Sequence, residues 1–367
     1  MSAESGARVD RDVSGVTSRS GVAVERLLVV GLGSIGQRHA RVAQRVRPGI
    51  QVAAWRHRRT DDPLPAGVSG AVWSIDEAIA FKPHAAIVAS PATHHLEAAH
   101  ALALAGVHLL IEKPIAAESA GIDELIAVCE RRGLTIMTGY NLRFLPSLNR
   151  FRVLVLEGAV GDVLSVRAEA GQYLPSWRPD ADYRNTVSAR ASLGGGVLLE
   201  LSHEFDYLRW IFGDVTWVQA VVSRQSQLDI DVEDTAHVVL GFERKSTGAE
   251  VIASLSLDFV RQDTTRCCTV IGTRGTLRWN GISGVVDIFR SGAAAWEQVA
   301  AEPVERDATY VAEWQAFLAG IETGCPVPVH GRDGLAVLRI VEAVRRAAAT
   351  SGTVRLESAH MSAGSQR

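Results

Sequence analysis

The sequence predicts an α/β protein of two parts, in which a parallel sheet with crossover helices precedes a mostly antiparallel sheet. Two observations predict this division. Up to about residue 140, short apolar runs alternate with helix-like segments, which is typical of a parallel sheet. Beyond that point, runs with period-two character follow one another with turn residues and few helices between them, which favours antiparallel strands.

The first part is expected to alternate strand and helix from residue 24 to residue 138. Its strands are continuous apolar runs, which indicates burial on both faces of the sheet. Gly106 and Gly133 stand where helices end, and Ser119 can cap the start of one. The expected strands are 24–30, 50–55, 85–90, 107–111 and 134–138, and the expected helices are 34–46, 76–81, 94–105 and 121–132.

The second part is expected to contain a sheet, one long helix before most of its strands, and two helices near the end of the chain. The long helix covers 196–212. The last two helices, 309–323 and 331–351, are expected to return and pack on one of the two parts. The expected strands are 163–171, 217–223, 235–242, 251–257, 267–272 and 275–279.

A glycine-rich loop joins the first strand to its helix and reads Gly31-x-Gly33-x-x-Gly36. Gly31 allows a tight turn, Gly33 lets the backbone approach a pyrophosphate, and Gly36 lets the helix pack against the strand. The start of the helix, at Ser34 and Ile35, would then face the phosphates. The pattern in this context predicts a dinucleotide-binding loop of the Rossmann type, and the alternative is a βα turn without a ligand.

The end of the second strand bears on the choice of dinucleotide. It reads Arg56-His57-Arg58-Arg59, and no acidic residue appears before Asp61. An acidic residue here would bind the ribose 2′-hydroxyl of NAD, whereas guanidinium groups bind a 2′-phosphate. The sequence therefore favours NADP over NAD, with Arg56 and Arg58 on the 2′-phosphate, and the alternative is a solvated basic loop.

Composition excludes several classes of partner. A net charge of −3 gives no reason to expect nucleic acid or an anionic membrane. None of the four cysteines forms a CxxC pair, which fits a reducing, cytoplasmic compartment. Residues 1–22 are polar and lack an apolar core, so a disordered leader is expected there, and residues 358–367 are expected to form a flexible tail. No stretch is apolar for long enough to span a bilayer.

Further motifs follow the glycine loop, and together they resemble a known family. They are Ser90-Pro91-Ala92-Thr93-His94-His95, Ala105-Gly106-Val107-His108 leading to Glu112-Lys113-Pro114, Tyr140-Asn141-Leu142-Arg143-Phe144, and Gly194-Gly195-Gly196 followed by His203 and Asp206. With the glycine loop and His39, this pattern resembles the Gfo/Idh/MocA oxidoreductases, named after glucose-fructose oxidoreductase, inositol dehydrogenase and a rhizopine-catabolism protein. The resemblance covers roughly residues 24–350.

The resemblance implies a dinucleotide-binding domain over 23–143 and a substrate-binding and oligomerisation α/β domain with an open antiparallel sheet over 144–357. It implies a homodimer or homotetramer formed through the outer face of that sheet. It also implies NAD- or NADP-dependent hydride transfer at a hydroxyl carbon of a sugar, sugar derivative or cyclitol. The cofactor contacts that it adds are Ser90, Pro91, His95, Glu112 and Lys113.

Lys113 is one of the two expected catalytic residues. It follows an apolar strand, so it lies at the carboxyl edge of a parallel sheet, where ligands bind. A lysine there can hydrogen-bond a substrate hydroxyl and relay its proton. On the residues alone, a surface lysine before a turn proline is the alternative. Glu112 is expected to orient Lys113 by charge pairing.

His203 is the second expected catalytic residue, because an imidazole can take a proton near neutral pH as hydride leaves the adjacent carbon. Asp206 shares its helical face and is expected to hold one tautomer. A hydrogen-bonded structural histidine is the alternative. Glu200 and His203 have a spacing that metal sites also use, but no supporting ligand cluster is evident in the sequence and no metal is expected.

The expected substrate contacts combine aromatic and polar side chains. Aromatic faces stack on sugar C–H surfaces, and arginines bind hydroxyls, carboxylates or phosphates. Many members of the resembled family carry Asp-x-x-x-His, whereas this chain has Glu200 at a shorter spacing from His203. The expected contacts are Lys113, Asn141, Arg143, Trp177, Arg178, Tyr183, Glu200 and His203. An ordinary ordered loop over 171–184 is the alternative for Trp177, Arg178 and Tyr183.

Two other functions stay open. Some relatives recycle a tightly held nucleotide, so that epimerisation or glycoside cleavage proceeds without net redox change. The other alternative is a non-catalytic regulator that senses a nucleotide or sugar.

Overall fold

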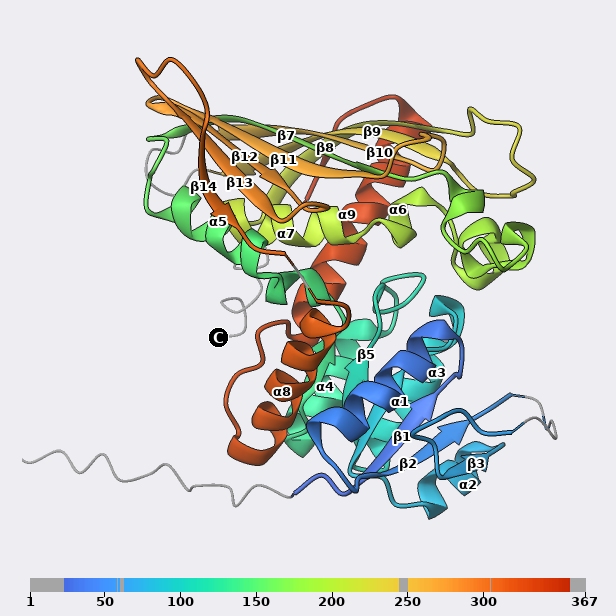
Figure 1. Ribbon diagram of the computed structural model, residues 1–367. Helices are drawn as coiled ribbons and strands as arrows, with labels where there is room; N and C mark the ends of the chain where they lie inside the picture. Colours follow the sequence, from blue (N-terminus) through green and yellow to red (C-terminus); the bar gives the residue numbers. More distant parts are fainter. Residues whose placement is uncertain (1–22, 58, 60–62, 244–249, 304, 357–367) are drawn as a thin grey trace, which may run out of the picture.

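The computed structural model describes residues 23–57, 59, 63–243, 250–303 and 305–356. A nine-stranded sheet forms the upper part of the view in Figure 1, a six-stranded sheet forms the lower part, and helices lie between them. The chain is therefore an α/β protein with two sheets, as predicted. The expected leader and tail, 1–22 and 358–367, lie outside the described residues.

The first sheet has the order β3-β2-β1-β4-β5-β6, and every pair in it is parallel. The order reverses between β1 and β4, which opens a crevice at their carboxyl ends. Five of the strands were predicted, and β3 was not, because it is a half-buried run of only three residues. The strands are β1 (Arg26–Val30), β2 (Gln51–Trp55), β3 (Gly70–Val72), β4 (Ala85–Val88), β5 (His108–Ile111) and β6 (Ile136–Thr138).

Four helices cross between these strands, and all four were predicted to within a residue or so of each end. Their ends follow local chemistry: the Ser74 side chain accepts a hydrogen bond from the Glu77 amide, and Gly133 ends its helix with φ +63°. The helices are α1 (Ser34–Val46), α2 (Ile75–Ala80), α3 (His95–Leu104) and α4 (Ile122–Arg132).

The second sheet has the order β14-β13-β12-β11-β7-β10-β9-β8-β15 and is antiparallel except where β7 pairs with β10. The six predicted strands are all present. The strands β13, β14 and β15 were missed, and β14 is exposed or half-buried along its whole length. The strands are β7 (Val163–Gly171), β8 (Val215–Ser223), β9 (Thr235–Glu243), β10 (Glu250–Asp258), β11 (Thr265–Gly272), β12 (Gly275–Asn280), β13 (Val285–Arg290), β14 (Glu297–Ala301) and β15 (Val354–Arg355).

The helix predicted over 196–212 is interrupted. Leu201 and Ser202 form a turn between α6 (Val197–Glu200) and α7 (His203–Phe212), so Glu200 ends one helix and His203 begins the next. Helix α5 (Pro146–Leu156) was not predicted. Short 3-10 helices also occur, namely η1 (Ala92–His94), η2 (Asn141–Phe144), η3 (Leu174–Ser176), η4 (Tyr183–Asn185), η5 (Val187–Ala189) and η6 (Ala191–Leu193).

The last two helices join the two sheets. Helix α8 (Ala308–Thr323) packs against α1, as Figure 1 shows, so the end of the chain returns to the first sheet. Helix α9 (Gly331–Thr350) contacts α4 and β6 on one side and α7 and β8 on the other. In the described part of the chain, no helix is long and apolar enough to cross a membrane.

Candidate active site

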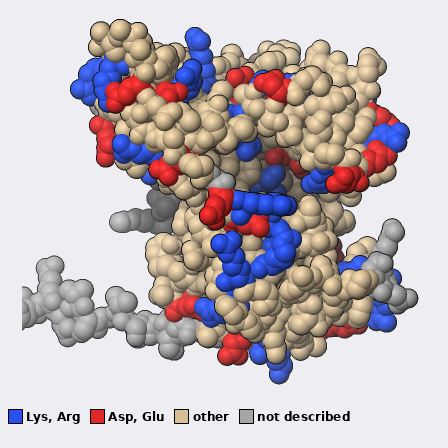
Figure 2. All heavy atoms as spheres, viewed as in Figure 1, with Lys and Arg blue, Asp and Glu red and all other residues tan. Residues whose placement is uncertain are grey.

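A cavity of about 670 Å³ opens between the two sheets, at the carboxyl ends of the parallel strands. Figure 2 shows the narrowed waist between the two halves, where basic and acidic side chains gather. Most of the residues predicted for the site line this cavity: Gly31, Gly33, Ser34, Ile35, Arg56, Ser90, Pro91, His95, Glu112, Lys113, Asn141, Arg178, Glu200 and His203. The cavity thus collects motifs that are up to 172 residues apart, as between Gly31 and His203.

The glycine loop forms one wall, and each glycine has its own reason. Gly31 has φ +90°, a backbone conformation that favours glycine, and it lies against the backbone of Ala89 and Ser90. A side chain at this position would therefore be strained and would also collide with that backbone. A Cβ on Gly36 would lie 1.9 Å from the Gly31 carbonyl oxygen, because α1 and the loop touch there. Gly36 therefore packs beneath the loop and does not line the cavity.

Gly33 is different, because a Cβ there would meet no protein atom within 4 Å. It precedes α1, whose first turn has no acidic residue and no side-chain cap. The backbone N–H groups at that helix end are therefore turned to the cavity and suit a negatively charged group. An open approach at Gly33 beside a helix N-terminus fits the pyrophosphate of a dinucleotide.

The basic segment after β2 divides. Arg56 and His57 line the cavity. Arg59 turns away, with its guanidinium 4.9 Å from the centre of the Trp73 ring and 3.5 Å from a Glu77 carboxylate oxygen. Arg58, the second residue predicted to bind a 2′-phosphate, lies outside the described residues.

His95 holds two loops together at the base of the cavity. Its Nδ1 lies 3.0 Å from the Pro114 carbonyl oxygen and its Nε2 lies 2.6 Å from the Ser90 carbonyl oxygen. Burial lowers the pKa of His95, although both carbonyl contacts oppose the shift. The ring thereby ties the segment after β4 to the segment after β5.

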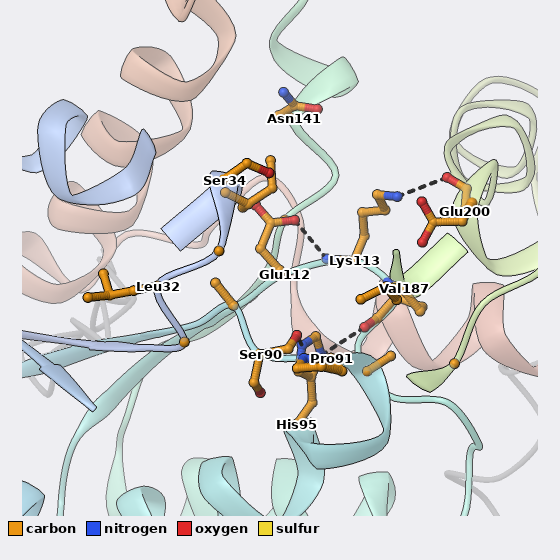
Figure 3. A pocket seen from close by; sticks show the side chains of 18 of the residues that line it. Leu32, Ser34, Ser90, Pro91, His95, Glu112, Lys113, Asn141, Val187 and Glu200 are labelled. Carbon is orange, nitrogen blue, oxygen red and sulfur yellow. Dashed lines mark hydrogen bonds between the residues drawn. The ribbon is translucent and has the colours of Figure 1, made fainter. Parts of the chain in front are cut away.

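Lys113 reaches across the cavity to the second sheet's helices. Its Nζ donates a 2.8 Å hydrogen bond to the Glu200 carbonyl oxygen, at the C-terminal end of α6 (Figure 3). That carbonyl is free to accept because the helix is interrupted at Leu201, and the end of a helix favours a cation. The Glu200 carboxylate accepts a bond from the Ser188 hydroxyl.

The predicted charge pair between Glu112 and the Lys113 ammonium is not formed. Its Oε2 accepts the Lys113 backbone N–H at 3.1 Å, and its Oε1 lies 2.7 Å from His39 Nε2. The expected orientation of Lys113 by Glu112 therefore acts through the backbone, and the side chain of Lys113 is held by Glu200 instead.

His203 lies beside Lys113 at the cavity, with the Tyr140 ring edge-on at 5.5 Å between ring centres. Its Nδ1 is buried and has no hydrogen-bond partner in the described part of the chain. Burial, and then the positive charges of Lys113 and Arg266, lower the pKa of His203 well below its usual value. At neutral pH the imidazole is therefore uncharged and able to accept a proton.

The prediction that Asp206 holds His203 is wrong, because both Asp206 oxygens bind Arg143 at 2.6 and 2.9 Å. Arg143 in turn is buried and absent from the cavity lining, so its expected contact with substrate is corrected as well. It also donates to the Pro328 carbonyl and lies 3.4 Å from Asp333. Burial opposes its charge, but Asp206 and Asp333 outweigh burial and raise the pKa of Arg143. The pair fastens η2 to α7, the helix that begins at His203.

The aromatic segment 171–184 contributes one residue to the main cavity, Arg178. Trp177 packs edge-on against Phe259, and the Tyr183 hydroxyl accepts the Asp229 amide, so both line a small adjoining pocket. Sequence reasoning missed Tyr310 of α8 among the cavity residues. The sequence predicted that this helix packs on one of the two parts of the chain, but no motif indicated that its tyrosine reaches the cavity.

Comparison with known proteins identifies the family. The model of the NAD-binding Rossmann fold of the oxidoreductase family matches residues 26–140, and the model of the family's C-terminal alpha/beta domain matches residues 152–356. The chain belongs to the Gfo/Idh/MocA family of NAD(P)-binding oxidoreductases.

Individual relatives agree with this assignment. Myo-inositol 2-dehydrogenase of Thermotoga maritima is 27% identical over 364 residues, covering 90% of this chain and 98% of the relative. 1,5-Anhydro-D-fructose reductase of Ensifer adhaerens is 27% identical, covering 80% of this chain and 86% of the relative. The solved structure of GenD2 from gentamicin A biosynthesis, in complex with NAD, is 26% identical with a TM-score of 0.74, covering 94% and 100% of the two chains.

Proposed function

We propose that this protein is an NAD(P)-dependent oxidoreductase that transfers hydride between the nicotinamide C4 and a hydroxyl-bearing carbon of a sugar, sugar derivative or cyclitol. The observation that carries the proposal is that Lys113 and His203 meet beside the dinucleotide loop in one cavity. The relatives named above act on inositol and on an anhydro sugar, which supports this substrate class.

In this mechanism the bound nicotinamide supplies the hydride-accepting carbon. Lys113 binds the substrate hydroxyl through Nζ, which the Glu200 carbonyl holds in the cavity. His203 takes the hydroxyl proton because it is uncharged at neutral pH. Glu200 and Arg178 bind other oxygens of the substrate, and Asn141 borders the same space. In the reductive direction the same groups return the proton to the carbonyl oxygen.

We propose that NADP binds more tightly than NAD. Arg56 and His57 line the cavity at the end of β2, where the adenosine ribose of a dinucleotide on this loop would lie. Binding titrations of NADPH and NADH to the wild type and to Arg56→Ala test this proposal. It fails if NADH binds the wild type as tightly as NADPH does.

We also propose a homo-oligomer formed through the outer face of the nine-stranded sheet. On that face Val221 is 64% exposed and Ile252 is 45% exposed, so apolar side chains face away from the helices. Light scattering of the wild type against Val221→Lys tests the contact.

The cysteines Cys129, Cys267, Cys268 and Cys325 are free thiols, which supports the proposal of a reducing, cytoplasmic compartment.

The reaction itself is tested with NAD⁺ or NADP⁺ and a panel of myo-inositol, D-glucose and D-glucuronate. We expect reduced nicotinamide to accumulate with at least one of these polyols. Product formed with only catalytic cofactor and no net reduction would favour the redox-neutral alternative. Binding of polyol and cofactor without any product would favour the sensing alternative.

A further inference from the structure

A buried acid lies behind the strand end that carries Lys113, and the reaction described above does not use it. Glu313, on α8, is fully buried, as is His39 on α1. Single oxygen or nitrogen atoms of Glu313, His39 and Glu112 all lie within 4.8 Å of one another. Three titratable groups from three distant segments therefore lie together, with His39 and Glu313 fully buried and Glu112 at the edge of the cavity.

The hydrogen bonds assign the protons on two of these groups. The Trp314 indole N–H donates to His39 Nδ1 at 3.0 Å, so Nδ1 carries no proton. A neutral His39 then carries its proton on Nε2 and donates it to Glu112 at 2.7 Å. The Lys113 backbone N–H donates to the other Glu112 oxygen. Glu112 thus receives a donor at each oxygen and is held as a carboxylate.

The same assignment disfavours a metal ion in this space. A metal would need the lone pair of His39 Nε2, but that nitrogen must carry the ring proton while Nδ1 accepts from Trp314. Protons, rather than a cation, are therefore the groups that balance charge in this cluster.

Among the residues that the structure describes, the Glu313 carboxyl has no partner that would compensate a negative charge. Neither of its carboxyl oxygens has a hydrogen-bond partner in the described part of the chain. Burial, and then the negative charge of Glu112, raise the pKa of Glu313 well above its usual value. For Glu112, burial opposes ionisation, but the hydrogen bond from His39 outweighs it and lowers the pKa of Glu112. One carboxyl is therefore charged and its neighbour is neutral.

The charged groups on the surrounding elements do not change this balance. On α8 itself, Tyr310 contacts His39 edge-on, and Arg38 of α1 stacks on that tyrosine while it pairs with Asp307. The segment η2 also packs on α8, and its Arg143 is engaged by Asp206.

We propose that Glu313 is a positioning residue that acts in its protonated form. As a neutral acid it leaves the negative charge of the cluster on Glu112, and together with Trp314 and His39 it fixes the backbone of Lys113 at the end of β5. The catalytic part of this inference rests on the proposed function, whereas the protonation of Glu313 does not. Two kinds of measurement can therefore separate them.

The first measurement is thermal unfolding of the wild type and Glu313→Gln as a function of pH. When folding raises the pKa of a carboxyl, the folded protein loses stability as pH rises from the unfolded pKa of that group toward its folded pKa. Gln cannot ionise, so we expect the Tm of Glu313→Gln to gain on that of the wild type between about pH 5 and about pH 8. The control is Glu322→Gln on the same helix, because Arg47 pairs with Glu322 and lowers its pKa. Its Tm should fall behind that of the wild type only as pH rises to about pH 5, and the difference should then stay constant up to about pH 8.

A constant or shrinking Tm difference for Glu313→Gln would overturn the protonated assignment. Infrared spectra at neutral pH give a direct check, since the band of a protonated carboxylic acid should be present in the wild type and lost in Glu313→Gln. A stoichiometric metal that disappears with Glu313 would also overturn the proposal.

The second measurement is turnover. We expect Glu313→Ala to lower kcat by up to about 10²-fold through misplacement of Lys113, with the Kd for NADH little changed. Glu313→Gln should restore most of that loss, because it keeps the shape and neutrality of the protonated acid. Equal kcat in the Ala and wild-type proteins would contradict the positioning role. If the wild type turns over none of the panel polyols, the proposed function fails, and the unfolding and infrared measurements still decide the protonation of Glu313.

Discussion

Two parts of the cavity lining differ in the groups that they present, since one presents backbone and the other presents side chains. The wall of the first sheet offers mainly backbone, namely the loop around Gly33 and the start of α1. The rest of the lining, here called the side-chain wall, offers side chains whose places depend on long-range contacts. Lys113, which follows β5 of the first sheet, reaches Glu200 of α6 across 87 residues. A backbone site can be recognised from a short motif, whereas a side-chain site is specified only when the chain has folded. The first wall should therefore tolerate few backbone changes, and the second should respond to single side chains.

Loss of the Lys113 ammonium should give the largest effect. Lys113→Met keeps much of the side-chain volume but removes the group that binds the substrate hydroxyl, so we expect kcat/KM to fall by about 10³-fold. Binding of NADH, followed by fluorescence, should change far less. If turnover survives in Lys113→Met, the side-chain wall is not where the chemistry occurs.

Loss of Arg143 should act on stability rather than on substrate binding. Arg143→Met leaves Asp206 buried without its bidentate partner, and we expect the free energy of unfolding to fall by about 3 kcal/mol in urea titrations. Arg152→Met is the matched control, because Arg152 stacks on the same Trp210 ring and is much less buried. A raised KM with unchanged stability in Arg143→Met would return Arg143 to the substrate site.

Loss of the His203 imidazole should lower kcat/KM for oxidation by about 10²-fold. The wild-type rate should fall in acid as His203 becomes protonated, and His203→Gln should lack this acid limb. Folding lowers the pKa of His203, so its neutral form favours stability above the unfolded pKa, and that contribution is lost as pH falls toward the folded pKa. A wild-type rate that does not fall in acid, or the same acid limb in both proteins, would assign the proton acceptor elsewhere.

Substitutions at Gly36 and Gly33 should give the smallest effects, and they should distinguish a glycine needed for packing from one needed for the approach of the ligand. A methyl group at Gly36 collides with the Gly31 carbonyl, so Gly36→Ala should lose about 1–3 kcal/mol of unfolding free energy. A methyl group at Gly33 meets open space, so Gly33→Ala should change stability by less than about 0.5 kcal/mol. It should nevertheless weaken NADH binding, because the backbone must come close to the pyrophosphate. Urea titrations and NADH titrations on the same samples compare the two, and equal behaviour would contradict the assigned roles.

The sequence predicted the two sheets and the cavity lining better than it predicted the partners within the cavity. The Gly31–Gly36 loop and the Glu112-Lys113-Pro114 motif carry local signals, because their positions follow from strand ends and turns. The pairing of Asp206 with Arg143 could not be read locally, since it depends on η2 meeting α7 across 63 residues.

The interrupted helix and the buried acid show the same limit. The turn at Leu201 and Ser202 that frees the Glu200 carbonyl lies within an apolar run that fits a continuous helix. Glu313 lies on a helical segment with no motif. Its place beside His39 and Glu112 depends on the packing of α8 against α1, which no local pattern predicts.

Direct hydride transfer is the central step of the proposed function, and isotope transfer tests it. Myo-inositol and D-glucose labelled with deuterium on their hydroxyl-bearing carbons are each incubated with NAD⁺ or NADP⁺ and the protein. We expect deuterium at C4 of the reduced nicotinamide, in an amount equal to the oxidised product, with transfer abolished in Lys113→Met. Oxidised product without deuterium in the nicotinamide, or equal transfer by Lys113→Met, would contradict it.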